Sequence, residues 1–270
     1  MKILSQSQYF GAQRWELYHE GISLSEYDYL APGTPWHYHE NPYFMYVIKG
    51  NMLDIGKAGS AQLPPGSLMF LNWEETHRTE KHSITSGRGF HLQVERRWLQ
   101  AQGVHLGLWE GNQVLNHPDF HLLLSKIYYE FRRADAFSMV AIELLVLELC
   151  SSLTERFKLP LKEPPPWMEA LKTILHEGTS PLSLAALSLE LGVHPVHISR
   201  TVPLFLDTTL GDYLRKLRIS KSLPLILSGE QPLTQIAFAC GFSDQSHFTR
   251  TFKSYFGQTP SAFQRGNRLG

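Results

Sequence analysis

The sequence predicts a protein of two domains with mixed α and β structure: an antiparallel β-barrel carrying a helical hairpin, then an all-helical domain. Three observations lead to this fold class. Between Trp15 and Val94, short runs of Tyr, Phe, Val and Ile alternate with Pro and Gly turn signals, as in antiparallel sandwiches and small barrels. From Phe120 onward the apolar period becomes helical. A proline-rich segment, 158–166, is then followed by a helix–turn–helix pattern that occurs twice.

Composition sets limits on the function. The 270 residues can form two domains that each bury a core, and Lys+Arg and Asp+Glu are balanced at 25 each. The balance is uneven along the chain, because residues 1–166 carry 15 basic and 18 acidic side chains whereas residues 167–270 carry 10 and 7. The mild basic excess therefore lies in the second domain, where attraction to phosphate would be modest and salt-sensitive.

The cysteines and the apolar runs indicate the compartment. Cys150 and Cys240 both lie in apolar helical patterns, so they are expected to be buried, reduced thiols of a cytoplasmic protein. The N-terminus has no apolar signal-peptide region. The most apolar run, 139–153, is interrupted by Glu143 and Glu148, so no membrane span and no membrane partner are expected.

A cluster of histidines precedes the clearest strand, which runs from residue 43 to 48 and is almost entirely apolar. His37 and His39 are two residues apart, so in a strand both side chains project into the same cavity. After the turn signal at 64–66 comes His77. The order of these residues resembles the cupin barrel, in which such histidines line the interior. We therefore expect residues 1–112 to form a cupin-like barrel.

Three roles for these histidines remain open. As candidate metal ligands, His37, His39 and His77 would bind a divalent ion. Metal-dependent cupins carry a Glu four residues after the second His, a position that is Tyr43 here. A metal-free pocket for a small polar ligand is the favoured alternative, and satisfied interior histidines without a ligand are the third. The expected pocket residues are Trp36, His37, His39, Tyr43 and His77. Arg88 and His91, on a later strand, could reach the cavity or lie on the surface.

Residues 113–157 are expected to form a pair of apolar helices. Leu123, Ile127 and Phe131 continue one stripe, and Ile142 and Val146 belong to another. Such helices must pack either on the barrel or against a second subunit, and the sequence leaves both open. Residues 158–166, with their run of three prolines, are expected to be a semi-rigid linker.

The domain at 167–270 contains the pattern of greatest functional interest. Gly241 ends one short helix, and Ser243 is the expected N-cap of the next. In that next helix Phe248, Phe252 and Tyr255 share one face, and the opposite face is polar and cationic. Such a helix fits a DNA major groove, although periodicity alone equally allows a solvated amphipathic helix.

The same arrangement occurs earlier in this domain. Gly192 follows a helix, and His194 with Pro195 starts the next, in which Ile198 matches Phe248. Arg200 likewise matches Arg250, which indicates an internal duplication with two DNA-reading heads. A joining helix at 212–228 would separate the heads by about one DNA turn, about 34 Å.

The stretches 241–253 (Gly-Phe-Ser-Asp-Gln-Ser-His-Phe-Thr-Arg-Thr-Phe-Lys) and 256–263 (Phe-Gly-Gln-Thr-Pro-Ser-Ala-Phe) resemble the signature of the AraC/XylS family of transcription regulators. The resemblance implies two helix-turn-helix units joined by a long helix. Many such regulators carry a sensory cupin that dimerises through adjoining helices, so the resemblance favours ligand sensing. It implies base contacts by Val196, Ser199 and Arg200 in one groove and by Gln245, Ser246, His247, Thr249 and Arg250 in the other. The candidates for phosphate contacts are Arg215, Arg218 and Lys253.

Three residues depart from the family pattern. Pro203 stands where a basic residue is usual, Asp207 replaces the usual Gly, and Pro224 interrupts the joining helix. A proline inside a helix removes a hydrogen bond and clashes with the preceding turn, at about 3 kcal/mol. The first head is therefore expected to be shortened or kinked.

Taken together, the sequence predicts a non-enzymatic, sequence-specific DNA-binding transcription regulator whose cupin-like domain senses a small, sugar-like or other polar molecule. The expected partners are a double-stranded DNA operator, a small-molecule effector and a second copy of the chain, with RNA polymerase as a further candidate. Two alternatives remain. One is a metal-dependent cupin enzyme fused to a DNA-binding module, and the other is a constitutive regulator whose barrel only dimerises.

Overall fold

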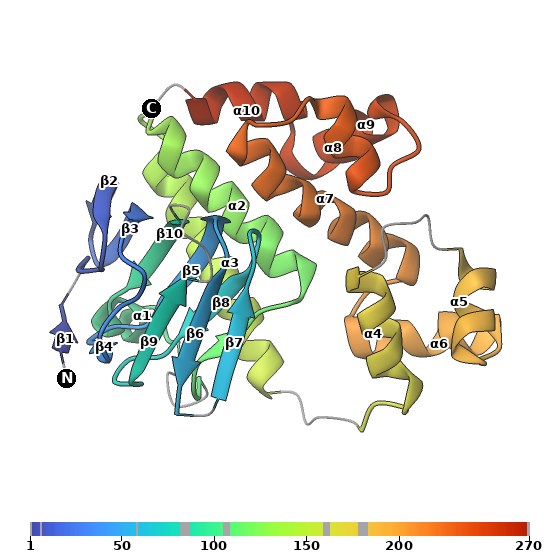
Figure 1. Ribbon diagram of the computed structural model, residues 1–270, viewed down its shortest axis with the longest axis horizontal. Coiled ribbons are helices and arrows are strands. Elements are labelled where there is room, and N and C mark those ends of the chain that lie inside the picture. The colour runs from blue at the N-terminus through green and yellow to red at the C-terminus, as the bar shows by residue number, and fades with distance from the viewer. Residues whose placement is uncertain are drawn as a thin grey trace. The chain divides into compact units, whose positions relative to one another are not determined.

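The computed structural model describes residues 2–5, 7–57, 59–81, 87–104, 109–158, 163–177 and 183–268. The chain divides into two compact units, Met1–Lys158 with Arg265–Gly270, and Leu159–Gln264 (Figure 1). Of the expected linker at 158–166, residues 159–162 lie outside the described residues.

The first unit is built around two β-sheets, whose strands pair antiparallel throughout except for β1 with β4. The five-stranded sheet has the order β1 (Lys2–Leu4), β4 (His37–His39), β9 (His77–Lys81), β6 (Met52–Gly56), β7 (Gly59–Leu63). The six-stranded sheet has the order β11 (Gln113–Val114), β8 (Leu68–Leu71), β5 (Tyr43–Lys49), β10 (Gly87–Val94), β3 (Ile22–Tyr29), β2 (Ala12–His19). The expected antiparallel β domain is confirmed, although the pairings among the described residues form two sheets and not one closed barrel.

The two sheets share an apolar core. Met45 and Val47 of β5 pack with Met52 of β6 and Leu63 of β7, so side chains from both sheets meet between them. Strand β5 is buried on both faces from residue 43 to 48, as its unbroken apolar run predicts. Its other face, together with that of β10, is covered by helices.

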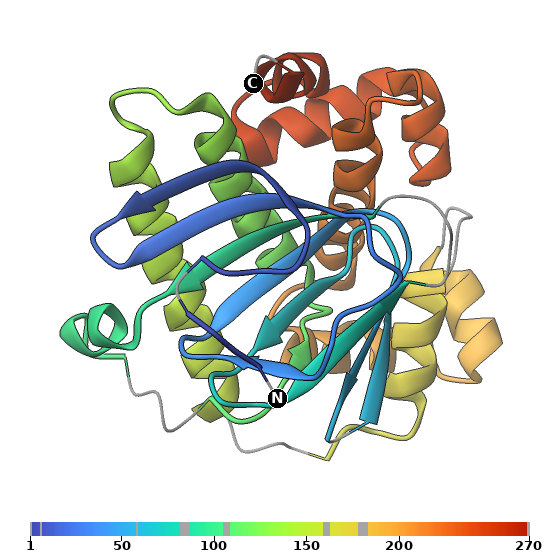
Figure 2. The ribbon, with the colours of Figure 1, turned by 60° about the vertical axis from the view of Figure 1, so that its left-hand side comes forward.

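Helices α2 (Pro118–Arg133) and α3 (Ser138–Lys158) pack on each other, and α2 packs on the six-stranded sheet, while α1 (Arg96–Ala101) follows β10 (Figure 2). The ring of Phe90 on β10 lies 4.9 Å from that of Tyr128 on α2. Fully buried Glu26 of β3 accepts hydrogen bonds from the Tyr128 hydroxyl at 2.8 Å and from Arg132 at 3.0 Å. The buried faces of the helical pair are therefore used within the chain.

The second unit is entirely helical in its described residues. The elements are α4 (Trp167–Glu177), α5 (Leu184–Leu191), α6 (Pro195–Leu206), α7 (Leu210–Ser228), α8 (Leu233–Ala239), α9 (Gln245–Phe256) and α10 (Pro260–Arg268). Leu171, Leu187, Ile198 and Tyr213 belong to one core, which joins α4, α5 and α6 to the start of α7. A second core is aromatic, with Phe248, Phe252 and Phe263 fully buried. Each short helix pair thus has a core of its own, and α7 extends between the two.

The first head was predicted to be shortened or kinked, and the prediction of shortening is wrong, whereas the kink stays a prediction. Helix α6 runs through Pro203 and has 12 residues, as many as α9. The amide that Pro203 lacks would have bonded the carbonyl of Ser199, which is an exposed residue whose carbonyl can be solvated. Helix α7 likewise runs through Pro224. Asp207 adopts the left-handed conformation (φ 52°) at the end of α6, the role that Gly257 fills after α9.

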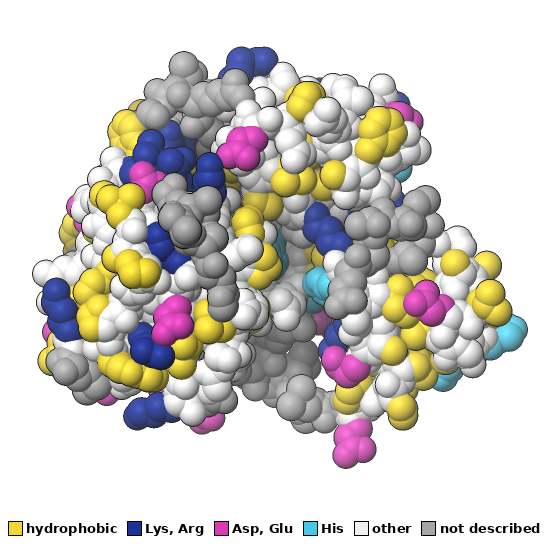
Figure 3. Space-filling view, viewed as in Figure 1, with side chains coloured by type: hydrophobic (Ala, Val, Ile, Leu, Met, Phe, Trp, Pro, Cys, Tyr) yellow, Lys and Arg dark blue, Asp and Glu magenta, His cyan; other side chains and the backbone are white. Residues whose placement is uncertain are grey.

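No helix in the described ranges combines the length and the apolar character that crossing a lipid bilayer requires. Cys150 and Cys240 are both buried free thiols, as predicted. Burial raises the pKa of each thiol to about 12. On the face shown in Figure 3, acidic and basic side chains of the first unit are interspersed.

Candidate interior site and nucleic-acid interface

The predicted histidines meet inside the first unit. His37 and His77 are opposite residues on β4 and β9, and with His39 they are at most 3% exposed. The centroid of the His37 ring lies 5.2 Å from that of His39 and 4.3 Å from that of His77. Burial lowers the pKa of His37 to about 4 and that of His39 well below its usual range, and the neighbouring His77 ring acts in the same direction on both.

Two hydrogen bonds fix the orientation of these rings. Nδ1 of His77 lies 2.7 Å from Oδ1 of Asp54, which is buried on the neighbouring strand β6. Nδ1 of His37 lies 2.8 Å from the carbonyl oxygen of Pro35. Among the described residues, neither ring nitrogen of His39 has a hydrogen-bond partner, and neither does Nε2 of His77.

The other predicted pocket residues divide into two groups. Tyr43 is buried, and the centroid of its ring lies 4.4 Å from that of His39, so Tyr43 belongs to the cluster. His91 is buried too, stacked at 3.9 Å on the ring of Tyr9. Trp36 was expected in the cluster, but this is wrong: it is 42% exposed and lies against the Arg78 guanidinium.

Arg88 also lies away from the histidines. Its guanidinium bonds Asp28 at 2.9 Å and lies 3.5 Å from Glu26. Arg14 contacts the same two carboxylates, at 2.8 Å and 3.4 Å. Of the two later-strand residues that the sequence left open, His91 is therefore interior, and Arg88 is half-buried in an ion-pair network around Glu26 and Asp28.

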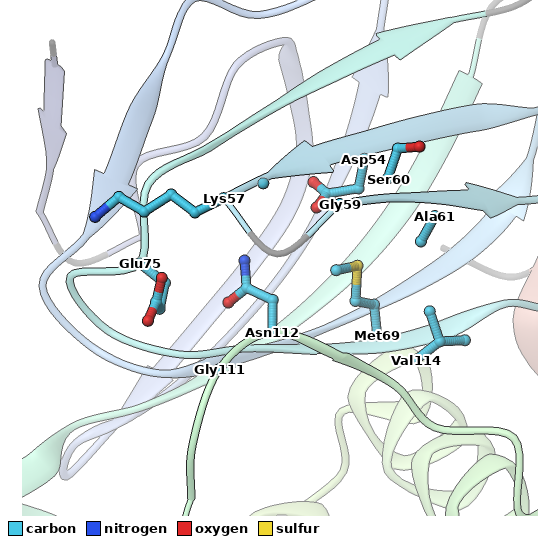
Figure 4. A pocket seen from close by; sticks show the side chains of 11 residues that line it. Asp54, Lys57, Gly59, Ser60, Ala61, Met69, Glu75, Gly111, Asn112 and Val114 are labelled. Carbon is cyan, nitrogen blue, oxygen red and sulfur yellow. The ribbon is translucent and has the colours of Figure 1, made fainter.

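A pocket of about 480 Å³ lies beside the histidine cluster. The hairpin β6–β7 supplies one side and the segment before and within β11 supplies the other (Figure 4). Its polar lining includes Asp54, Lys57, Glu75 and Asn112, and Met69 is part of its apolar wall. None of the five predicted pocket residues lines it. Asp54 is the residue that the pocket and the histidine cluster share.

In the second unit, the pair α8 and α9 forms the predicted helix, tight turn and helix. Gly241 follows α8 with φ 80°, a conformation that favours glycine. The cap of α9 is Asp244 and not the predicted Ser243: its carboxylate accepts a 2.7 Å hydrogen bond from the His247 amide. The same bond lowers the pKa of Asp244. Ser243 instead bonds the Asp244 carboxylate at 3.1 Å.

Helix α9 has the two faces that the sequence predicts. Phe248 and Phe252 are fully buried, whereas the opposite face is polar. Gln245 is exposed and its amide oxygen accepts a hydrogen bond from Thr234 of α8. Across that face, His247 and Thr249 are half-buried, and Gln245, Ser246, Arg250 and Lys253 are exposed.

The pair α5 and α6 repeats this geometry. Gly192 ends α5 in the left-handed conformation (φ 64°), and the His194 side chain caps α6 by accepting from the Val196 amide at 3.3 Å. Val196 is 49% exposed. Ser199 and Arg200 are exposed beside it, while the inward face of α6 is buried.

The joining helix α7 has 19 residues, which corresponds to about 28 Å at 1.5 Å per residue. It is tied to the second head, because the Tyr255 hydroxyl of α9 donates to Oδ1 of Asp212 at 3.0 Å. Arg215 lies 3.4 Å from the same carboxylate. Arg218 is half-buried, and desolvation lowers its pKa. Of the two predicted phosphate contacts on α7, Arg215 thus has a carboxylate partner within the unit, and Arg218 is partly desolvated.

A family model described as a helix-turn-helix domain matches residues 187–266. Probable transcription factor PqrA of Proteus vulgaris is 34% identical over 73 residues, which are 27% of this chain and 60% of that protein. Transcriptional regulator Rob of Salmonella typhimurium is 36% identical over 90 residues, which are 32% of this chain and 30% of that protein. Residues 187–266 form an AraC-type helix-turn-helix domain.

Two solved structures that resemble this chain differ in how much of it they cover. An apo variant of ToxT from Vibrio cholerae is 16% identical and covers 92% of this chain and 98% of its own, with a TM-score of 0.42. The C-terminal domain of AraT, a response regulator from Geobacillus stearothermophilus, is 27% identical and covers 38% of this chain and 88% of its own, with a TM-score of 0.37.

The AraC-type domain includes every residue for which a DNA contact was predicted. The predicted base contacts and Lys253 lie on the capped helices α6 and α9, and Arg215 and Arg218 lie on α7. In the first unit, sequence reasoning missed the pocket and its residues Lys57, Glu75 and Asn112. Asp54 did carry a signal, because β6 buries residues 52 and 54, so an inward-facing carboxylate on this strand indicates a polar interior. The other three lie in turns and loops that only the folded chain brings together.

Proposed function

We propose that the protein is a sequence-specific DNA-binding regulator of transcription whose β-rich unit senses a small molecule. The observation that carries this proposal is the pair of helix–turn–helix elements, each with a capped second helix that buries an apolar face and exposes a polar one. Relatives of the AraC-type domain are named as transcription factors and regulators. The chain spans 60% or less of the first relatives that it matches, so its activity as a whole rests on this proposal.

Each head would read DNA with the exposed face of its second helix. On α6, Arg200 would contact guanine, Ser199 a base edge or phosphate, and Val196 a thymine methyl. On α9 the readers would be Gln245, Ser246, His247, Thr249 and Arg250, with Lys253 on phosphate. Arg215 and Arg218 of α7 would contribute phosphate contacts, and Arg215 would exchange its contact with Asp212 for the backbone of DNA.

The two heads would enter successive major grooves on one face of the duplex. The length of α7, about 28 Å, approaches the pitch of B-DNA, about 34 Å. The operator should therefore contain two short blocks about one helical turn apart. The net charge of residues 167–270 is only mildly basic, so binding would depend more on base contacts than on charge alone.

The effector would occupy the pocket between the β6–β7 hairpin and the segment at 111–114. Its volume suits a small metabolite. One cationic side chain, Lys57, and two carboxylates, Asp54 and Glu75, lie around it, and Asn112 is oriented by a hydrogen bond from the Asn72 amide at 2.9 Å. A polar molecule that presents hydroxyl groups, such as a sugar or sugar acid, matches this lining. Coupling to DNA requires that the effector bind one state of the protein better than another.

Dimerisation would use the outer face of α3. Val140 and Leu144 on α3 and Phe137 just before it follow one another at helical spacing, and all three are more than half exposed. A stripe of this kind would be covered by the same stripe of a second copy in a symmetric contact. A regulator of this organisation would act on cytoplasmic DNA and would need no catalytic residues. If it activates transcription, it would also contact RNA polymerase.

The proposed function is tested by selection from a random-sequence DNA library with the purified chain. The expected result is an enriched motif of two blocks, whose enrichment is lost when Arg200 and Arg250 are both replaced by Ala. A matched control is Lys172→Ala, since Lys172 is a surface residue of α4 paired with Glu169. Recovery of unenriched sequence by the folded wild-type chain would refute DNA-sequence recognition.

The sensory part is tested by a thermal-shift screen of sugars, sugar acids and aromatic acids. A compound that stabilises the wild-type chain should lose its effect with Asn112→Ala and keep it with Glu40→Ala, because Glu40 is exposed and lies outside the pocket. An equal shift in both variants would place the effector elsewhere. Turnover of the compound by the purified chain would instead favour the enzyme alternative.

A further inference from the structure

We propose that His37, His39 and His77 bind a divalent transition-metal ion of the zinc class inside the β-rich unit, with Asp54 orienting His77 from behind. This site would be additional to DNA reading and does not depend on it. Four observations about the described residues support it: the convergence of the three rings, the fixed orientation of two of them, the unsatisfied nitrogens, and the nature of the donor set.

The three side chains converge. One possible ligand atom from each lies within 4.8 Å of the others, and all three residues are buried. Zinc binds imidazole nitrogen at about 2.0–2.1 Å, so two nitrogens on one tetrahedral ion are about 3.3 Å apart. The rings would have to close by about 1.5 Å at most, which small rotations of buried side chains can supply.

The hydrogen bonds of two histidines select the tautomer that a metal needs. The carboxylate of Asp54 and the carbonyl of Pro35 are acceptors, so His77 and His37 donate to them from Nδ1. Each imidazole is then left with an unprotonated Nε2. Metal-binding histidines are commonly held in this way, with the second ring nitrogen donating to a carboxylate or a backbone carbonyl.

His39 supplies an independent argument. Neither of its ring nitrogens has a hydrogen-bond partner among the described residues, although the side chain is only 2% exposed. Nε2 of His77 is in the same condition. Buried polar atoms without partners are rare in native proteins and call for an explanation. A metal ion coordinated by His39 and His77 would satisfy one nitrogen of each ring.

The donor set indicates the class of metal. The three ligands are neutral imidazoles, and neither a thiolate nor a carboxylate coordinates the ion directly. Such a donor set suits zinc, and also copper and nickel, whereas calcium and magnesium prefer oxygen ligands. Three protein ligands leave one position of a tetrahedral ion for water or another molecule. Because Asp54 also lines the pocket, the orientation of His77 would depend on a residue that an effector can contact.

The test uses the untagged chain of 270 residues and the metal alone as the probe. After dialysis against zinc and then against buffer, elemental analysis should find about one zinc per chain, and zinc should raise the melting temperature. Cobalt should give the visible absorption of a tetrahedral complex. His39→Asn should abolish all three signals. His91→Asn should retain them, since His91 is equally buried but lies outside the set. Asp54→Asn should weaken zinc binding by about 10- to 100-fold.

The proposal is overturned if the folded wild-type chain retains no zinc and responds to neither zinc nor cobalt, or if His39→Asn still binds zinc stoichiometrically. Should a variant fail to fold, a titration of the wild-type chain in chelator-buffered zinc decides the question alone. DNA selection with the metal-free chain separates the two proposals, because a lack of metal binding would leave the DNA motif unchanged.

Discussion

Replacing Arg200 or Arg250 by Ala tests whether both heads read DNA, since the sequence cast doubt on the first head alone. Both arginines are exposed on second helices of equal length, and among the described residues neither lies within ion-pair distance of a carboxylate. Arg250 contributes only a minor part, after the hydrogen bonds, to the lowered pKa of Asp244. Truncation should therefore change the free protein little, and the loss should report the contact with DNA. An arginine that reads guanine contributes about 1–3 kcal/mol, so each variant should lose about 5- to 150-fold in operator affinity. The heads have separate cores, so the double variant should lose the sum, about 2–6 kcal/mol.

The assay is fluorescence anisotropy with a duplex containing the selected operator, at a fixed salt concentration because affinity depends strongly on salt. Arg→Lys at each position is the matched control: it keeps the charge but removes the bidentate geometry, so most of the loss should remain. A loss below about 0.5 kcal/mol for Arg200→Ala, beside a full loss for Arg250→Ala, would mean that the first head does not read bases and would refute the equivalence inferred from α6.

Three further predictions concern stability and chemistry. Asp207→Gly should raise the free energy of unfolding, measured by denaturant titration, by up to about 1 kcal/mol. The reason is that glycine adopts the left-handed conformation without strain, as Gly257 does. A loss of stability would show that the Asp207 side chain stabilises the fold by more than its backbone conformation costs. The pKa of Asp244 is lowered in the folded chain, so its cap is fully effective above the pKa of an unfolded aspartate, about 3.9, and is lost as the pH falls through the lower folded value. Unfolding free energy should thus fall less steeply below pH 4 in Asp244→Asn than in the wild type, and identical slopes would contradict this. Cys150 and Cys240, whose pKa values burial raises to about 12, should react with a thiol reagent at pH 8 only after unfolding; rapid labelling of the native chain would show that the thiols are accessible.

The second unit could be predicted from the sequence largely because its signals are local. Apolar spacing placed Phe248 and Phe252 in the core, and Gly192 and Gly241 marked the turns. The cap was assigned to Ser243 and lies at Asp244, because both residue types cap helices and one residue of register is below what periodicity resolves.

The effect of proline in the first head was misjudged for a different reason. The cost of a proline inside a helix depends on whether the carbonyl it leaves without a donor can find water, and on how far the tertiary core holds the helix. Ile198 before the affected turn and Leu206 after it are both buried in the core of the first head, and they anchor α6 on either side of Pro203. Neither quantity can be read from local sequence alone.

In the β-rich unit the sequence indicated strands and the inward direction of alternate residues, and so brought His37 and His39 together. It could not give the partner strand of each, and therefore missed that Asp54 of β6 bonds His77 of β9. Trp36 was misplaced because it lies just before β4, where alternation no longer determines the direction of a side chain. The pocket depends on four separate segments, around residues 54–61, 69, 75 and 111–114, and had no sequence signal of its own.

The most direct test of the central claim, that one chain reads two successive grooves with two heads joined by α7, is a change in the spacing of the operator. Five base pairs inserted between the two blocks of the selected motif place them on opposite faces of the duplex. If α7 fixes the separation of the heads, affinity for this duplex should fall to that of a duplex with one block scrambled. Equal affinity for the original and the inserted duplex would contradict the account, because it would show that the two blocks are not bound together by the two heads.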